Sequence, residues 1–183
     1  KINKNQLTIP APMAVGAVHH KLINIGLRCD TNLIIETGSA RNPHHFAVLL
    51  GYGATAIYPY LAFEILNEMV VKKKLTIQKY SESVKNYTHG INKGILKIMS
   101  KMGISCVSSY RGAQLFEIVG LDDNIVNLCF KDTISRVSGA RFKDIEVDIE
   151  ENRCLAWDIG KEIKTGGLLK YVHNEEHHDY NPN

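Results

Sequence analysis

Short apolar segments that alternate with helical segments in the first third of the chain most strongly constrain its fold. Residues 32–36 form a brief apolar run before a Thr-Gly turn, which predicts a buried strand. Asn42 and Pro43 then supply a helix N-cap and a first helical residue, and Gly51 is expected to end that helix. Residues 54–58 predict a second strand, followed by another helical pattern. This order favours the α/β class with parallel strands, arranged as a partial barrel or an open sheet.

Amphipathic helices are predicted on both sides of this unit. Residues 11–25 carry apolar side chains at helical spacing, and residues 80–102 form the longest such stripe. Thr76 is expected to cap the longer helix. Gly90 and Gly94 each cost a helix about 1 kcal/mol relative to alanine, so we expect close packing where they lie.

The second half of the chain predicts short elements with less regular patterns. Residues 104–107 are expected to form a third strand, and residues 113–119 a short helix ended by Gly120. Asp122 can cap a further short helix. Residues 141–151 fit a strand by alternation and a helix by their spacing of three and four, and we prefer the helix.

The division of the chain into segments follows its composition. A length of 183 residues corresponds to one domain of ordinary size. We interpret residues 1–12, which contain two prolines, as a linker or entry segment, and residues 13–164 as the α/β core. Residues 165–183 are polar and rich in turn formers, which is typical of an extended tail. Residue 1 is Lys rather than Met, as expected of a processed chain or of a piece of a longer one.

Charge and cysteine content argue against several classes of protein. The net charge is +3, and a solvated helix end explains the only basic block, Lys72–Lys74, better than a nucleic-acid site does. The apolar runs fall short of the roughly 18 residues that a membrane-spanning helix needs. No secretion signal is visible at the start. The four cysteines are widely spaced, so we expect reduced thiols in a cytoplasmic protein rather than a disulfide framework or a metal site.

Predicted junctions between strands and helices carry the polar side chains of greatest interest, because α/β folds place ligands there. At the first junction, Glu36 precedes His44 and His45, where backbone amides could hold an anion; a local turn explains the same residues. At the second, Arg111 and Gln114 could meet a carboxylate, a phosphate or an acid of a neighbouring domain. Alternatively, Arg111 pairs with a carboxylate of the core.

The third junction, residues 131–136, ends in Arg136, and an ordinary surface loop is the alternative reading. A nucleophile elbow, a Walker loop, H-E-x-x-H and G-x-G-x-x-G are all absent from the sequence. We therefore predict no catalytic, cofactor-binding or metal-ligating residue in this segment. The candidate interdomain or anion contacts are Glu36, His44, His45, Arg111, Gln114 and Arg136.

The histidines raise the question of a metal site. His173 and His177 are four residues apart, a spacing that suits zinc on one helix face. The nearby Gly and Asn-Pro argue against a helix there, and no third ligand is evident. His19 and His20 are adjacent, so on a helix they point about 100° apart and do not easily share one ion.

Read together, these segments resemble the large (alpha) subunit of glutamate synthase, in the later part of its central domain. The resemblance covers about two thirds of the chain and fades after Phe142. Ser138 stands before Gly139 where the family pattern has a second glycine. The segments that carry the resemblance, in chain order, are residues 14–20 (AVGAVHH), 36–38 (ETG), 40–41 (AR), 44–47 (HHFA), 51–54 (GYGA), 59–61 (PYL), 97–105 (KIMSKMGIS), 109–114 (SYRGAQ), 119–121 (VGL) and 129–130 (CF).

The resemblance implies a role within a larger enzyme. Glutamate synthase makes two L-glutamates from glutamine and 2-oxoglutarate with a reductant. An amidotransferase domain with an N-terminal cysteine releases ammonia, and a domain with FMN and an iron–sulfur cluster uses it. By this resemblance, the present segment holds neither cofactor and is a non-catalytic scaffold between those two domains that contributes to the ammonia path. Its tail leads toward the FMN domain.

Partners and location are implied in the same way. The partners are the amidotransferase and FMN domains of the same polypeptide, together with a small reductase subunit or ferredoxin, in the cytoplasm or the plastid stroma. The electron donor, NADPH, NADH or ferredoxin, stays open. The alternative function is a self-contained α/β enzyme or binding domain that holds an anionic metabolite at the strand ends. That alternative predicts a pocket joining Arg111 to Glu36 or His44.

Overall fold

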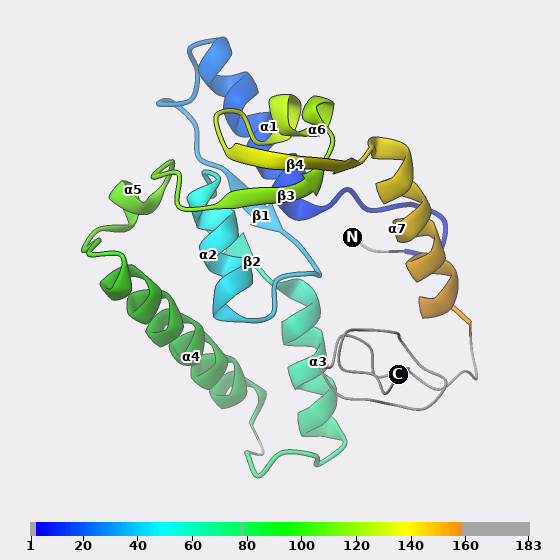
Figure 1. The fold of residues 1–183 in the computed structure, drawn as a ribbon. Coiled ribbons are helices and arrows are strands. Elements are labelled where there is room, and N and C mark those ends of the chain that lie inside the picture. The colour runs from blue at the N-terminus through cyan, green and yellow to red at the C-terminus, as the bar shows by residue number, and fades with distance from the viewer. Residues whose placement is uncertain (1–2, 78, 159–183) are drawn as a thin grey trace, which may run out of the picture.

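Two pairs of parallel strands, each joined through a helix, organise the fold (Figure 1). The computed structural model describes residues 3–77 and 79–158. In chain order, its elements are α1 (Ala11–Asn24), β1 (Ile34–Glu36), α2 (Pro43–Gly51), β2 (Ala56–Tyr58), α3 (Tyr60–Val71), α4 (Tyr80–Lys101), α5 (Val107–Tyr110), β3 (Glu117–Leu121), α6 (Asp123–Cys129), β4 (Ile134–Ala140) and α7 (Phe142–Ala156).

The first strand pair confirms the predicted βαβα unit. β1 and β2 run parallel, with Ile35 opposite Ile57, and α2 connects them. The Asn42 side chain accepts a hydrogen bond from the His45 backbone N–H, so the predicted N-cap of α2 is present. Gly51, predicted to end α2, is its last helical residue. The turn is made at Gly53, whose φ of +111° is accessible to glycine but rarely to other residues.

The second strand pair corrects two predictions from the sequence. Residues 113–119 were expected to be helical, but β3 begins at Glu117 and Gly120 lies within it, at φ +80°. β3 pairs in parallel with β4, and the register shifts on either side of Val119. A short apolar run does not reveal its period, and the pairing with β4, a contact remote in sequence, decides its conformation. The α/β class with parallel strands stands, as two separate pairs.

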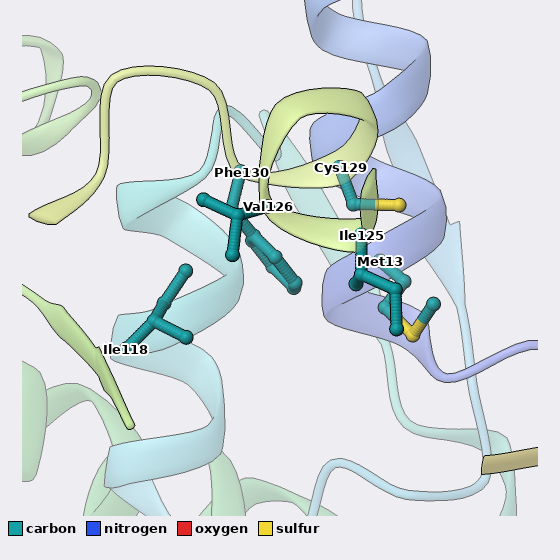
Figure 2. Close-up of a cluster of buried hydrophobic side chains, with 6 residues drawn as sticks. All are labelled: Met13, Ile118, Ile125, Val126, Cys129 and Phe130. Carbon is teal, nitrogen blue, oxygen red and sulfur yellow. The ribbon is translucent and has the colours of Figure 1, made fainter. Parts of the chain in front are cut away.

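The first core cluster lies where α1 and α6 are in close contact. An added Cβ at Gly16 would lie 1.7 Å from the carbonyl oxygen of Cys129, so only glycine allows this approach. Beside it, Ile125 is fully buried. Figure 2 shows this cluster, in which α1, β3 and α6 converge. Its buried members are Met13, Ile118, Ile125, Val126, Cys129 and Phe130.

The long helix α4 packs against α2 at one of its two glycines. A Cβ at Gly94 would meet the Pro43 ring at 2.3 Å, which confirms the expected close packing, whereas Gly90 faces open space. The helix begins at Tyr80 with Lys79 as N-cap, so the prediction of a cap at Thr76 is wrong. Leu75 and Thr76 lie in a bend outside any helix.

Residues 104–107 were predicted to form a strand, and this is also wrong. The chain turns after α4 into the single-turn helix α5, because Tyr110 is buried against Ala47 and Met99 and draws the chain back toward α2. The preference for a helix over residues 141–151 is confirmed by α7. Within the described ranges, no helix is both long and apolar enough to cross a membrane.

Candidate functional site

A small cavity lies where α1, the end of α2 and two loops meet. Its volume is about 290 Å³. We call it the His19 cavity. It is lined by His19, His20, Ile23, Gly51, Tyr52, Tyr110, Gly112, Ala113, Gln114, Leu115, Phe116, Lys131, Asp132 and Thr133. It therefore unites parts of three segments that resemble glutamate synthase, residues 14–20, 51–54 and 109–114, with the loop before β4.

Arg28 fixes the orientation of His19. Its Nε donates to His19 Nδ1 at 2.8 Å, and its two terminal nitrogens donate to the carbonyl oxygens of Thr31 at 2.9 Å and Gly53 at 2.8 Å. A Cβ at Gly53 would lie 2.4 Å from His19 Nδ1, so glycine is required for this approach. Because Nδ1 accepts a hydrogen bond, the neutral ring carries its proton on Nε2, which is the donor that it can offer to the cavity.

Both histidines of the cavity favour the neutral form. Burial, followed by the Arg28 guanidinium, holds the pKa of His19 below its ordinary value, and Arg111 acts in the same direction. Burial also lowers the pKa of His20, against the opposing effect of the Asp132 carboxylate. At neutral pH the rings are therefore uncharged hydrogen-bonding groups.

The two loops that close the cavity are held in uncommon backbone conformations. Gln114 and Asp132 have φ values of +52° and +65°, which are uncommon for residues other than glycine. The Gln114 side-chain amide donates to the Asp132 carbonyl at 3.5 Å, and the Gly112 N–H donates to the Gly51 carbonyl at 2.9 Å. These bonds join both loops to each other and to α2, so the cavity has defined walls.

A second, larger cavity contains Glu36. It lies between the N-terminal segment, α1 and β1, and has a volume of about 680 Å³. We call it the N-terminal groove. Its apolar lining is open to solvent, because Ile9 and Ile34 are 72% and 71% exposed and Val18 is also exposed. The Arg153 guanidinium donates to the Lys4 carbonyl, so a hydrogen bond joins α7 to the N-terminal segment that leads into the groove. Figure 1 shows this segment running beside α7.

The remaining candidate contacts lie outside both cavities. His44 is exposed on the first turn of α2, and the His45 Nδ1 accepts the Arg41 N–H at 3.2 Å. Burial, then Arg41, lowers the pKa of His45. Arg111 is half-buried directly after α5. Arg136 is largely exposed on β4, 3.9 Å from the Glu117 carboxylate.

The structure therefore groups only some of the candidate contacts. Gln114 lines the His19 cavity, and Arg111 lies close enough to influence the pKa of His19. Glu36 lines the separate N-terminal groove, and neither Glu36 nor His44 lines the cavity near Arg111.

The cysteines of the described ranges do not fit a metal cluster. No three His, Cys, Asp or Glu side chains are grouped there so as to hold a metal ion. Cys129 is buried in the core, where burial raises the pKa of its thiol, whereas Cys29, Cys106 and Cys154 are exposed. The predicted histidine pair, His173 and His177, lies outside the described residues.

Comparison with known proteins identifies the family. A family model described as the glutamate synthase central domain matches residues 1–122. The chain belongs to the glutamate synthase central-domain family. This confirms the resemblance that the sequence segments indicated.

Relatives of the glutamate synthase family match 81–100% of this chain. It is 40% identical to the glutamate synthase [NADPH] large chain of Bacillus subtilis, over 100% of this chain and 12% of the relative. It is 40% identical to the ferredoxin-dependent glutamate synthase of Pyropia yezoensis, over 99% of this chain and 12% of the relative. It is 46% identical to the glutamate synthase [NADH] of Saccharomyces cerevisiae, over 81% of this chain and 7% of the relative. The chain thus spans about an eighth or less of these relatives.

Reading the sequence alone missed the centre of the His19 cavity in this glutamate synthase central-domain chain. The sequence presents His19 and His20 as part of a segment that resembles glutamate synthase and as a possible metal pair, and no local pattern singles out Arg28. Gly53, two residues after a helix, was a usable signal, because a glycine there indicates a special backbone conformation or a close approach. Nothing local indicates that the close neighbour is His19, more than 30 residues earlier in the chain.

Proposed function

We propose that the chain is a scaffold segment of a glutamate synthase, the enzyme that forms two L-glutamates from glutamine, 2-oxoglutarate and a reductant. In this proposal it lies between the amidotransferase and FMN domains of one polypeptide and helps to form the ammonia path. FMN and the iron–sulfur cluster belong to other parts of that polypeptide. The observation that carries the proposal is the match of 81–100% of this chain to glutamate synthases. The chain spans only 7–12% of the length of those relatives.

The names of the relatives support a role apart from electron supply. They specify NADPH, NADH and ferredoxin, yet all of them match this segment at 40–46% identity. A segment shared among enzymes named for three electron donors is better suited to a common structural task than to donor recognition. A reductase subunit or ferredoxin is therefore a partner of the whole enzyme, in the cytoplasm or the plastid stroma.

The N-terminal groove supports contact with a neighbouring domain. Apolar side chains scattered singly on a surface are ordinary, but here Ile9, Val18 and Ile34 line one groove and are exposed together. Glu36, a predicted interdomain contact, lies at the same groove. Burying such side chains against another domain contributes about 25 cal/mol per Å² of apolar area.

The test uses the full-length glutamate synthase that carries this segment. Ile34→Asp places a charge in the groove without disturbing the core, because Ile34 is mostly exposed. We expect less glutamate to form per glutamine hydrolysed, with unchanged FMN content. Val71→Asp, equally exposed at the end of α3 and outside the groove, is the matched control. An unchanged ratio in Ile34→Asp would contradict the proposed contact.

A further inference from the structure

We propose that the His19 cavity is a binding site for a small oxyanion that bears a carboxylate or phosphate group. The site does not depend on the scaffold role, since it rests on side chains of this chain alone. The fold brings together hydrogen-bond donors for such an anion at His19, His20 and Gln114, and an ammonium group at Lys131.

The charge around the cavity favours an anion. Arg28 and Arg111 act on His19, while Lys131 and Asp132 act on His20. Lys131 is the cation that lines the cavity beside Asp132, and the two guanidiniums near His19 add positive charge behind its wall. A low-dielectric concave wall strengthens the resulting positive potential. A divalent cation would need several carboxylate or carbonyl ligands, and Asp132 is the one acid in the described lining.

The available donors match the edge of an oxyanion. The Arg28 hydrogen bond commits His19 to Nε2–H as its donor, and the Gln114 amide and the Lys131 ammonium offer further N–H groups. N–H donors and an ammonium form charge-assisted bonds with carboxylate or phosphate oxygens. Tyr52, stacked on Phe116 with ring centroids 5.7 Å apart, supplies an apolar wall for a short carbon chain.

The size and rigidity of the cavity limit the ligand. Its volume of about 290 Å³ is at the lower end for small-molecule sites, which span about 300–1,000 Å³. The loops are bonded to each other at Gln114 and Asp132 and to α2 at Gly51, so little ordering is required on binding. A short dicarboxylate or inorganic phosphate fits these limits, whereas a nucleotide exceeds them.

The test follows the histidine ring signals of the 183-residue chain by NMR at pH 7. Sodium phosphate and sodium succinate are titrated in separate arms, with sodium chloride holding the ionic strength equal. We expect at least one arm to shift the His19 and His20 signals saturably while the signal of His89, exposed on α4, stays in place. A response to phosphate alone assigns a phosphate ligand, and a response to succinate alone a carboxylate.

Variants locate the site. Lys131→Gln and Gln114→Ala should each weaken binding by about tenfold or more. Lys97→Gln, an exposed lysine on α4, is the matched control and should leave binding unchanged. The proposal is overturned if neither anion shifts the signals of His19 and His20, or if the His89 signal shifts to the same extent. It is also overturned if Lys131→Gln and Gln114→Ala both bind the anion as tightly as the original chain does.

Discussion

Arg28 illustrates how a single side chain joins distant parts of this chain. It donates to His19 on α1, to Thr31 in the following loop and to Gly53 after α2. A lysine has one ammonium in place of the planar fork and does not reproduce this geometry. Since Nδ1 of His19 accepts the Arg28 N–H, protonating the ring would lose that bond and place two cations side by side.

This arrangement predicts a loss of stability in acid. Because the folded-state pKa of His19 is lowered, the unfolded chain binds a proton at higher pH than the folded one. Stability is then fully present above about pH 6.5 and falls as the pH drops below it, by at most about 1.4 kcal/mol per pH unit for one proton. His20 and His45 act in the same sense.

His19→Asn should make this fall shallower, because asparagine can still accept the Arg28 bond but does not titrate. Urea denaturation at several pH values between 7 and 5 measures the slope. His89→Asn replaces an exposed histidine on α4 and is the control, with an unchanged slope. Identical slopes for His19→Asn and the original chain would refute the prediction.

At the scale of elements, the two glycines of α4 have opposite roles. Gly94 lies against Pro43 at the start of α2, whereas Gly90 faces open space. The first therefore sets how closely α4 and α2 approach, and the second only weakens the helix.

Alanine substitutions should separate these roles. Gly94→Ala forces α4 away from α2 and should cost about 1–3 kcal/mol, as overpacking does. Gly90→Ala, the matched control, should stabilise the chain by about 0.5–1 kcal/mol through helix propensity. Chemical denaturation measures both free energies of unfolding. Equal effects of the two substitutions would contradict the packing described here.

Elements with explicit local signals could be predicted from the sequence, and elements decided by distant contacts could not. Asn42-Pro43 predicted the start of α2, and the β1–β2 order predicted the parallel pair. Residues 104–107 and 113–119 carried only short apolar runs, and the burial of Tyr110 and the pairing with β4 determined their structure. Of the His19 cavity, Gln114 was predicted as a contact, but the Arg28–Gly53 bond spans 25 residues and left no local pattern.

At the scale of the whole molecule, Tyr52 connects the core clusters. It packs against the cluster around Ile125 and against the cluster around Val15, and its ring also contacts Phe116 and Phe130. The two strand pairs belong to different clusters, so this residue couples the halves of the fold that they define.

Removing the Tyr52 ring should weaken that coupling. Tyr52→Ala is expected to cost about 2–3 kcal/mol, less than the loss of a fully buried aromatic ring because Tyr52 is half-buried, and to broaden or split the unfolding transition. Tyr52→Phe should cost about 1 kcal/mol or less, because the hydroxyl makes only a 3.4 Å hydrogen bond to Thr133. Thermal unfolding followed by circular dichroism and by tryptophan fluorescence tests both. A single unshifted transition in Tyr52→Ala would exclude this coupling role.

The contact between α1 and α6 also has a consequence for synthesis on the ribosome. Each strand pair closes locally, within residues 34–58 and 117–140, and Val15 of α1 packs against α2. The side of α1 that carries Met13 and Gly16 is covered by α6, about a hundred residues later. At a synthesis rate of roughly 5–20 residues per second, α6 follows α1 by about 5–20 s. During that interval Met13 and the bare backbone at Gly16 have no α6 to pack against. On the nascent polypeptide, α1 thus keeps an uncovered apolar side until α6 has been made, which is the kind of surface that chaperones protect.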